Sequence, residues 1–329
     1  MDTVGSGCMS CSIPGMEDAG CIFLFGYNPA DSHPIVARRI VRAKEKGCKI
    51  IVADPRHIET ARIADIYLPI NNGCNVAFLN AFANCLVNDG LYDKEFVAEH
   101  TNGFDEWWET IKNYTPESVQ DITDVEPALI HQAAEMYATA KPSAIIGWGM
   151  GVCQQKQNLK TVHTIASIAC IAGQIGKPNS GLAPVRGQNN VQGSCDMGML
   201  PNLYPGYQKV TDPAVRAKFA KAWGVPEEKL PLEEGYKLTD LGHLVDEGKV
   251  HCFYNYGEDP VQTEPDSAGM RKTLSELDLF ICQDIFMTQT TMLADVILPA
   301  TSWGEHEGVF TASDRSFQHF DAAVPPKGE

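Results

Sequence analysis

The sequence predicts an α/β fold in which two Rossmann-like parallel-sheet domains are related by an internal repeat and accompanied by additional helices. Three observations favour this fold class. Short apolar strands alternate with amphipathic helices, glycine-rich turns follow the strands, and one set of landmarks occurs twice along the 329 residues. Strands separated by helices pair in parallel, because a helical crossover returns the chain to the same end of the sheet.

The individual elements follow from the spacing of apolar residues. Apolar runs bounded by turn residues predict strands at 21–26, 49–53, 66–68 and 143–147. Amphipathic spacing predicts helices at 34–46, from about residue 75, over most of 91–140 and at 159–175, with further helix in 209–248. The stretch 181–199 is rich in Gly, Asn and Gln and lacks either periodicity, so it predicts an ordered loop around a polar group.

The internal repeat has three landmarks in register. A strand ends in Gly-x-x-Pro, a second strand ends in an aspartate, and the sequence Ala-Asp-x-x-Leu-Pro follows. The alternative is that any two strand–helix–strand units share such geometry. That alternative explains neither the repeated proline nor the repeated Ala-Asp-x-x-Leu-Pro sequence, so duplication is favoured. The landmarks are Gly26, Pro29, Asp54 and residues 64–69 in the first copy, and Gly257, Pro260, Asp284 and residues 294–299 in the second.

The loops after these strands contain side chains suited to nucleotides. Nucleotides bind at the carboxyl edge of parallel sheets, so two related halves predict two nucleotides or one large cofactor with two nucleotide arms. Asp54 and Asp259 can accept hydrogen bonds from ribose or guanine, Ser32 and Thr263 can hold phosphates, and Arg56 suits an anion. Taken singly, each is more simply a turn former or a helix cap, and their repetition favours binding. Neither GxGxxG nor GxxxxGKS is present, so the usual NAD and ATP fingerprints are missing.

The segment 184–193 places one guanidinium and four side-chain amides within ten residues. Burying such a set without polar partners is costly. It therefore predicts contact with a large polar cofactor and a small anionic substrate, for which Arg186 is the bidentate carboxylate partner. The alternative is an exposed polar loop in which Arg186 forms a surface ion pair.

Composition excludes several classes of function. The formal net charge of −16 disfavours a nucleic-acid or membrane-surface partner, and no apolar run approaches the length of a membrane span. The sequence shows no signal peptide, and its 11 scattered cysteines are explained by reduced thiols in a cytoplasmic protein. Cys8 and Cys11 form one CxxC pair, which without a second pair is weak evidence for a metal or iron–sulfur site, and we predict no metal ligand in this chain.

Several longer runs closely resemble one enzyme family over nearly the whole chain. They resemble the catalytic subunit of molybdenum or tungsten formate dehydrogenases, within the bis-molybdopterin guanine dinucleotide oxidoreductases. The runs are FGYNPADSHP, DPRHIETARIAD, GWGMGV, GKPNSGLAPVRGQNNVQGSCDMG, PGYQKV, GEDPVQT and QDIFMTQTTMLADVILPATSWGEHEG.

The resemblance implies an enzyme that interconverts formate and carbon dioxide with two pterin guanine dinucleotides around one molybdenum or tungsten atom, in contact with electron-transfer subunits. The family's substrate-orienting arginine matches Arg186. Its cofactor-contacting positions match Asn28, Asp31, Ser32, Arg56, Gly73, Asn75, Met150, Gln154 and Gln188 in the first half, and Gly257, Asp259, Thr263, Gln283 and Asp284 in the second.

The resemblance also implies parts that the sequence does not contain. We expect a first dinucleotide-binding domain at 1–190 and a partial second one at 191–329. The family's 4Fe–4S segment, its metal-ligating cysteine or selenocysteine, and its carboxyl-terminal capping domain are expected outside this range, so the fragment is expected to be inactive alone. Two alternatives remain: a structural subunit that has lost the cofactor, and a related oxidoreductase for another oxo-anion such as nitrate.

Overall fold

The computed structural model describes residues 3–5 and 7–327 and divides into two compact units. Unit 1 comprises residues 1–192 and 311–316, and unit 2 comprises 193–310 and 317–329. Residues 311–316 therefore group with unit 1, although the sequence expectation assigned them to the second domain. The outer ends of the two expected domains, residues 1 and 329, lie outside the described residues.

Unit 1 is built on a five-stranded, fully parallel sheet with the strand order β3-β2-β1-β4-β5. All four strands predicted from the sequence are confirmed within one residue. Their continuous apolar character follows from burial on both faces. The strands are β1 (Cys21–Phe25), β2 (Lys49–Ala53), β3 (Ile66–Leu68), β4 (Ala144–Trp148) and β5 (Gly181–Pro184).

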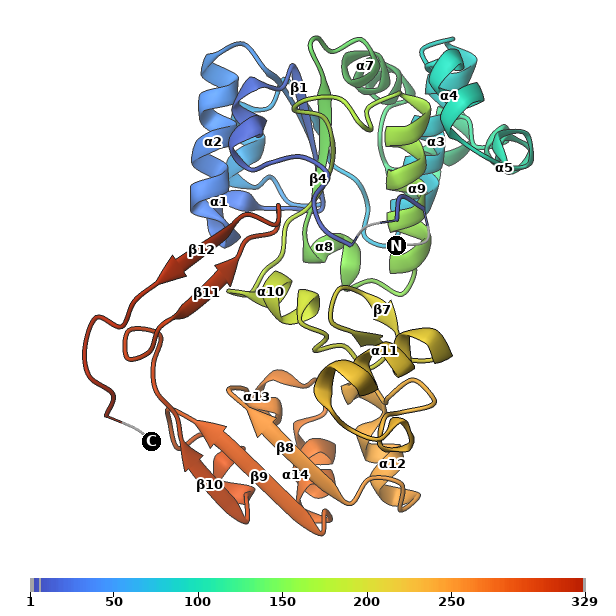
Figure 1. Cartoon of the computed structure of the whole chain (residues 1–329). Coiled ribbons are helices and arrows are strands. Elements are labelled where there is room, and N and C mark those ends of the chain that lie inside the picture. Colours follow the sequence, from blue (N-terminus) through green and yellow to red (C-terminus); the bar gives the residue numbers. More distant parts are fainter. Residues whose placement is uncertain (1–2, 6, 328–329) are drawn as a thin grey trace. The chain divides into compact units, whose positions relative to one another are not determined.

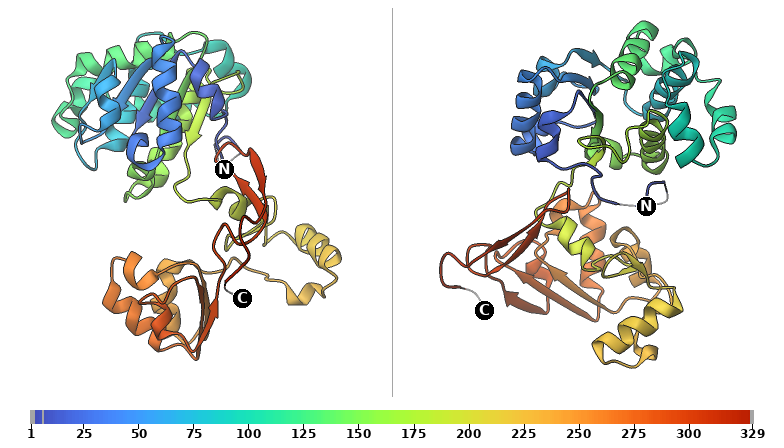
Figure 2. Two further views of the ribbon diagram at one scale, coloured as in Figure 1. Left: turned by 90° about the vertical axis from the view of Figure 1, so that its left-hand side faces the viewer. Right: turned by 45° about the horizontal axis from the view of Figure 1, so that its top comes forward.

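Helices cover both faces of this sheet (Figures 1 and 2). Because side chains alternate along a strand, Ile22 and Leu24 of β1 pack in one apolar cluster with α2, whereas Phe23 and Phe25 pack in the other with α3, α7 and α9. The first face carries η1 (Pro14–Asp18), α2 (Pro34–Glu45) and η2 (Glu59–Ile63); the second carries α3 (Asn75–Asn88), α7 (Pro127–Ala138) and α9 (Asn158–Ile171).

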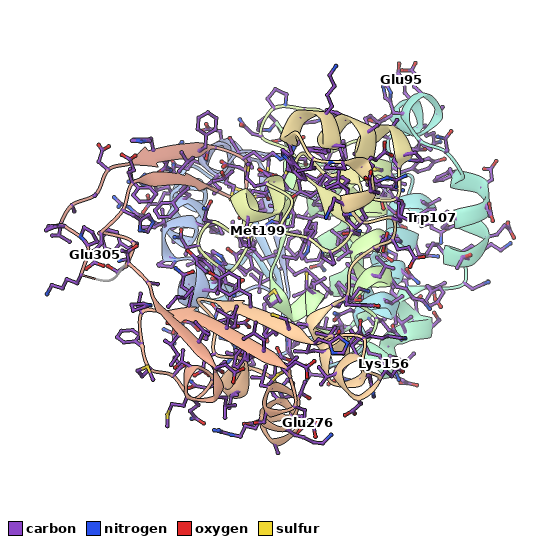
Figure 3. All side chains as sticks on the ribbon, turned by 60° about the horizontal axis from the view of Figure 1, so that its bottom comes forward. Glu95, Trp107, Lys156, Met199, Glu276 and Glu305 are labelled. Atoms are coloured by element: carbon purple, nitrogen blue, oxygen red, sulfur yellow. The ribbon has the colours of Figure 1, made fainter. Side chains whose placement is uncertain are left out.

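Smaller helices complete unit 1. Two four-residue helices follow β1 and β4, namely α1 (Pro29–Ser32) and α8 (Met150–Cys153). Farther from the sheet lie α4 (Lys94–His100), α5 (Phe104–Ile111) and α6 (Pro116–Thr123); Figure 3 labels Glu95 of α4 and Trp107 of α5 at the rim of the unit.

The expected loop at 181–199 is only partly a loop. It begins with strand β5 and contains a helix, α10 (Val191–Asp196). Leu182 and Ala183 are buried because they continue the sheet beside β4, which a two-residue apolar run between glycine and proline does not reveal by periodicity. The irregular parts are residues 185–190 and 197–199.

Unit 2 contains a three-stranded parallel sheet with the order β10-β9-β8. Its strands are β8 (Cys252–Tyr256), β9 (Leu279–Asp284) and β10 (Val296–Pro299). The helical elements are α11 (Pro213–Trp223), η3 (Glu227–Lys229), η4 (Leu238–Asp240), α12 (Leu241–Asp246), α13 (Pro260–Thr263), α14 (Ser267–Ser275) and η5 (Thr291–Leu293). Figure 3 labels Glu276, which follows the last residue of α14. Two antiparallel hairpins are formed by β6 (Leu203–Tyr204) with β7 (Gln208–Lys209), and by β11 (Gly308–Thr311) with β12 (Phe317–Phe320).

The internal repeat is confirmed in three dimensions, since β8, β9 and β10 repeat the order and direction of β1, β2 and β3. The aspartate of Ala-Asp-x-x-Leu-Pro has the same task in both copies. Asp65 Oδ2 accepts a hydrogen bond from the Ile50 N–H at 2.8 Å, and Asp295 Oδ2 accepts one from the Phe280 N–H at 2.8 Å. In each copy, the aspartate of this motif therefore anchors the start of the second strand.

The two sheets differ in what covers them. In unit 1, Phe23 and Phe25 are fully buried, whereas Tyr254 and Tyr256 at the matching positions of β8 are 52% and 66% exposed. The other face of the second sheet packs against α12 and α14 around Phe280. Among the described residues, no helix is long and apolar enough to cross a membrane.

Candidate functional site

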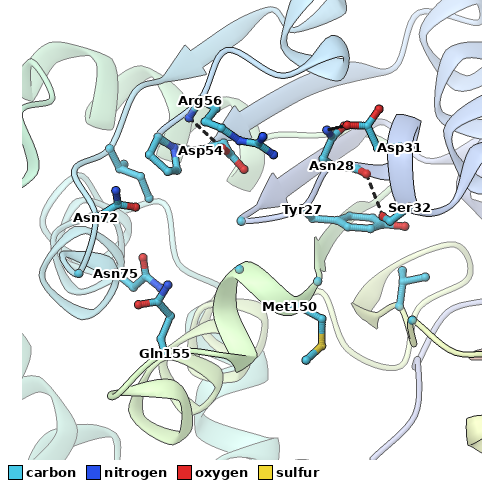
Figure 4. A pocket seen from close by; sticks show the side chains of 18 of the residues that line it. Tyr27, Asn28, Asp31, Ser32, Asp54, Arg56, Asn72, Asn75, Met150 and Gln155 are labelled. Atoms are coloured by element: carbon cyan, nitrogen blue, oxygen red, sulfur yellow. Dashed lines mark hydrogen bonds between the residues drawn. The ribbon is translucent and has the colours of Figure 1, made fainter. Parts of the chain in front are cut away.

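A pocket of ≈ 410 Å³ lies at the carboxyl edge of the unit 1 sheet (Figure 4). It is lined by residues from the loops that follow all five strands, which places it where β1 and β4 leave the sheet in opposite directions. The lining residues are Gly26, Tyr27, Asn28, Asp31, Ser32, His33, Asp54, Pro55, Arg56, Ile70, Asn71, Asn72, Gly73, Asn75, Gly149, Met150, Gly151, Gln155, Val185 and Gly187.

The loop after β1 presents several polar groups to this pocket. Asn28 Nδ2 donates to Asp31 Oδ2 at 2.6 Å, and Ser32 Oγ donates to the Asn28 carbonyl at 2.8 Å. The Asn28 Oδ1 and Tyr27 Oη atoms are buried without a hydrogen-bond partner. Burial raises the pKa of Tyr27, so its hydroxyl keeps its proton and is available as a donor. Buried unpaired groups are costly, and a polar ligand in the pocket would satisfy them.

The loop after β2 places an aspartate and an arginine at the pocket. Asp54 is buried, and one of its oxygens accepts the Arg56 N–H at 2.9 Å, which is the turn-forming contact expected for an aspartate after a strand. Burial raises the pKa of Asp54, although this hydrogen bond and the Arg56 charge oppose the rise. The Arg56 guanidinium is exposed toward the pocket (Figure 4) and suits a phosphate or another anion.

Close backbone packing shapes the floor of the pocket. A Cβ atom on Gly151 would lie 2.6 Å from the Gly26 carbonyl oxygen, and one on Gly149 would lie 2.8 Å from the Tyr27 ring. The first and fourth strand loops therefore approach closely only because both positions lack side chains. In Figure 4 the Asn75 side chain, at the start of α3, points toward Gln155. Asn75, the first residue of this helix, lines the pocket, and the start of a helix favours an anion.

Arg186 lies between two pocket-lining residues and is fixed by segments far apart in the sequence. Its Nε donates to Gln192 Oε1 at 2.8 Å and its Nη2 donates to the Gly7 carbonyl at 3.0 Å. Its backbone N–H donates to Ser313 Oγ at 2.8 Å, and His33 Nε2 lies 2.7 Å from its carbonyl oxygen. Two of these bonds are made by the guanidinium, to an amide oxygen and a backbone carbonyl, and two by the Arg186 backbone, to a hydroxyl and an imidazole.

Unit 2 brings its predicted residues together at the carboxyl ends of β8 and β9. Gly257 has φ +65° and donates its N–H to the Gln283 carbonyl at 2.9 Å, as Gly26 with φ +54° does to Ala53. Asp284 Oδ1 accepts the N–H groups of Ile285 and Phe286 at 2.6 and 3.2 Å, which repeats the Asp54 turn.

Three of the predicted unit 2 residues also have structural partners. Asp259 Oδ1 accepts from Thr290 Oγ1 at 2.5 Å and from the Thr290 N–H at 3.2 Å. Thr263 Oγ1 donates to the Asp259 carbonyl at 3.2 Å, and the Tyr254 hydroxyl donates to Gln283 Oε1. Asp259 therefore stabilises its own loop in addition to any ligand contact.

The structure gathers most, but not all, of the predicted first-half residues in one pocket. Asn28, Asp31, Ser32, Asp54, Arg56, Gly73, Asn75 and Met150 line it. Gln154 and Gln188 are exposed outside the lining set, and their neighbours Gln155 and Gly187 line the pocket instead. Tyr27 and His33 were missed by the sequence analysis, although both lie within the FGYNPADSHP run.

Cys8 and Cys11 are buried in unit 1. Cys11 Sγ lies 3.9 Å from the Leu182 carbonyl, and burial raises the pKa of its thiol to about 12. This thiol is protonated at neutral pH, which fits a core residue.

The fold and the pocket define an α/β protein with a polar pocket at the carboxyl edge of a parallel sheet. The family model for molybdopterin oxidoreductases matches residues 1–329, and the chain belongs to that family. This confirms the family resemblance and the fold class expected from the sequence.

Individual relatives agree with this assignment. The chain is 56% identical to formate dehydrogenase H of Escherichia coli over 99% of this chain and 45% of the relative, and 45% identical to the F420-dependent formate dehydrogenase 1 subunit alpha of Methanococcus maripaludis over 99% and 47%. It thus spans about half the length of the curated relatives it matches. Among solved structures, acetylene hydratase from Pelobacter acetylenicus matches with a TM-score of 0.75 and 25% identity, over 96% of this chain and 48% of that one.

Proposed function

We propose that this chain forms part of a formate dehydrogenase catalytic subunit that binds a bis-molybdopterin guanine dinucleotide cofactor with molybdenum or tungsten. The observation that supports it most is the position of Arg186. Hydrogen bonds hold its guanidinium beside a pocket in which the Tyr27 Oη and Asn28 Oδ1 atoms are buried without a hydrogen-bond partner. The names of the 56% and 45% identical relatives favour formate as the substrate, and the words "subunit alpha" in the second favour further subunits, which we propose to be electron-transfer partners.

The residues of unit 1 fit one guanine dinucleotide arm. Asp54 offers an acceptor for ribose or guanine donors, Arg56 a positive charge for phosphate, and Tyr27 Oη and Asn28 Oδ1 an unpaired donor and acceptor. The glycine turns let a pyrophosphate approach the backbone. Asp259, Gln283 and Asp284 supply the corresponding acceptors for the other arm at the repeated crevice of unit 2.

The bound cofactor would supply the redox centre that takes two electrons as formate becomes carbon dioxide. The task of the chain itself is binding and orientation. The Arg186 guanidinium is planar and always charged, so it can hold a formate carboxylate in one orientation. The bonds from Nε and Nη2 fix that plane before substrate arrives, which lowers the entropy cost of correct positioning.

The alternative of a structural subunit without cofactor is weakened by the pocket. Without a ligand, Tyr27 Oη and Asn28 Oδ1 would remain buried and unpaired, at a cost of about 1–3 kcal/mol each. No observation in the structure favours nitrate or another oxo-anion over formate.

The proposal is tested in the full-length enzyme that contains this segment. We expect the purified enzyme to contain molybdenum or tungsten with guanine dinucleotide and to oxidise formate. Arg186→Lys keeps the charge but loses the planar fork, so kcat/KM for formate should fall about tenfold or more while cofactor content stays unchanged. Arg62→Lys, at an exposed ion pair with Glu59, is the matched control and should behave as wild type.

Each measurement can contradict one part of the proposal. Metal-free, nucleotide-free enzyme would refute the cofactor assignment. Loaded enzyme that leaves formate unchanged would refute the substrate. Wild-type kcat/KM in Arg186→Lys would remove Arg186 from the substrate site.

A further inference from the structure

A cluster of possible metal ligands lies in the helical layer of unit 1. Cys85 of α3, Asp89 directly after α3 and His131 of α7 each bring one ligand atom within 4.8 Å of the other two. Cys85 and Asp89 are four residues apart, so they lie on the same face of the helix, one turn from each other. His131 Nδ1 approaches Asp89 Oδ2 at 2.6 Å from the facing helix.

A fourth group stands close to this cluster. The Glu117 carboxylate, in the first turn of α6, acts electrostatically on both Cys85 and His131. Helices α3, α6 and α7 all pack against one another. Helices α3 and α7, with α6 packed against both, therefore bring a sulfur, a nitrogen and a carboxylate together.

We propose that Cys85, Asp89 and His131 form a binding site for a zinc-class divalent cation, with water as the fourth ligand. Thiolate and imidazole together favour Zn²⁺ over Mg²⁺, which prefers an all-oxygen shell. Ligand atoms around tetrahedral zinc are about 3–4 Å apart, which small side-chain rotations reach from the spacing seen here. The position also suits metal entry, because Asp89 and His131 are partly exposed while Cys85 forms the inner wall.

The proposed site is structural, and it is distinct from the nucleotide pocket. Asn75 at the start of α3 lines the pocket, whereas Asp89 follows the last residue of the same 14-residue helix. At 1.5 Å per residue, the two sites are about 20 Å apart. A bound ion would join α3 to α7 and thus stabilise the helical layer over the sheet.

The structure contains a natural control for this cluster. In unit 2, His251 Nδ1 pairs with Asp278 Oδ2 at 2.9 Å on the exposed surface, in an imidazole–carboxylate pair of the same type. Among residues 3–5 and 7–327, the Cys85 group unites three ligand atoms, whereas no third His, Cys, Asp or Glu ligand atom joins the His251–Asp278 pair. His251→Gln therefore removes an imidazole without touching the proposed site, and Cys252→Ser removes an exposed thiol in the same way.

The experiment is a Co²⁺ titration of the purified 329-residue chain, followed by competition with Zn²⁺. We expect one site with a thiolate-to-Co²⁺ charge-transfer band and tetrahedral visible absorption, displaced by Zn²⁺ but not by Mg²⁺. His131→Gln and Asp89→Asn should weaken binding by about 10- to 100-fold, the range typical of losing metal-site interactions. Cys85→Ser should abolish the charge-transfer band, and His251→Gln and Cys252→Ser should leave binding unchanged.

Thermal unfolding provides a second readout that does not depend on catalysis. Zn²⁺ at a concentration just sufficient to saturate the wild-type site should raise the Tm of the wild-type chain and of His251→Gln more than that of His131→Gln, which binds the ion more weakly. Because His131 and Asp89 are on the surface, their variants are expected to fold even if Cys85→Ser does not. Equal Co²⁺ affinity in wild type, His131→Gln and Asp89→Asn would overturn the proposal, as would a Co²⁺ spectrum without a thiolate band.

Discussion

Gln192 positions Arg186, and replacing it should affect substrate binding without affecting the cofactor. Gln192 is 1% exposed, and its Oε1 accepts the Arg186 Nε–H at 2.8 Å. Gln192→Met keeps similar volume but removes this acceptor from the charged Arg186 guanidinium. A hydrogen bond to a charged group contributes about 1.5–3 kcal/mol. If the guanidinium acts in the transition state, kcat/KM for formate should fall about 10- to 150-fold, at 1.36 kcal/mol per factor of ten.

The assay compares formate kinetics and cofactor content of the full-length enzyme. We expect KM to rise more than kcat falls, because a loosened arginine binds the carboxylate less well. Gln192→Glu restores the acceptor and should recover part of the activity, which a merely structural loss would not allow. Gln132→Met, on an exposed part of α7, is the control. Wild-type kinetics in Gln192→Met, or equal losses in the methionine and glutamate variants, would refute the positioning role.

Two further predictions concern Asp65 and Asp259. Asp65→Ala should lower the free energy of unfolding by about 1–3 kcal/mol in urea denaturation, because the Ile50 N–H loses its acceptor, whereas Asp65→Asn should cost less. Burial would raise the pKa of Asp65, but hydrogen bonds from Lys44 and Ile50 lower the pKa below its usual value. The ionised Asp65 therefore stabilises the folded state above the unfolded pKa of about 4, and this contribution disappears as pH falls through the folded pKa. A stability advantage of wild type over Asp65→Asn that grows as pH falls would contradict this. Asp259→Asn should lower retained guanine dinucleotide in the full-length enzyme while keeping an oxygen acceptor for Thr290, and unchanged occupancy would remove Asp259 from the site.

Much of the fold could be predicted from local sequence. Strands buried on both faces of a parallel sheet are short apolar runs, so residues 21–25 and 49–53 are recognisable without a structure. The repeated Ala-Asp-x-x-Leu-Pro sequence was equally visible, although its task was not. Only the backbone contacts of Asp65 and Asp295 show that the motif anchors a strand.

The sequence by itself determined the family, the parallel sheets, the repeat and the loops that carry polar residues, because these depend on side-chain pattern over a few neighbouring positions. The tertiary structure decided which loop residues face one pocket: Gln155 rather than Gln154, and Tyr27 in addition to Asn28. It also decided the partners of Arg186, which come from segments near residues 7, 33, 192 and 313. Contacts between residues so far apart in the sequence produce no periodic pattern in the local sequence. They exist only once the sheet has brought the ends of its strands together.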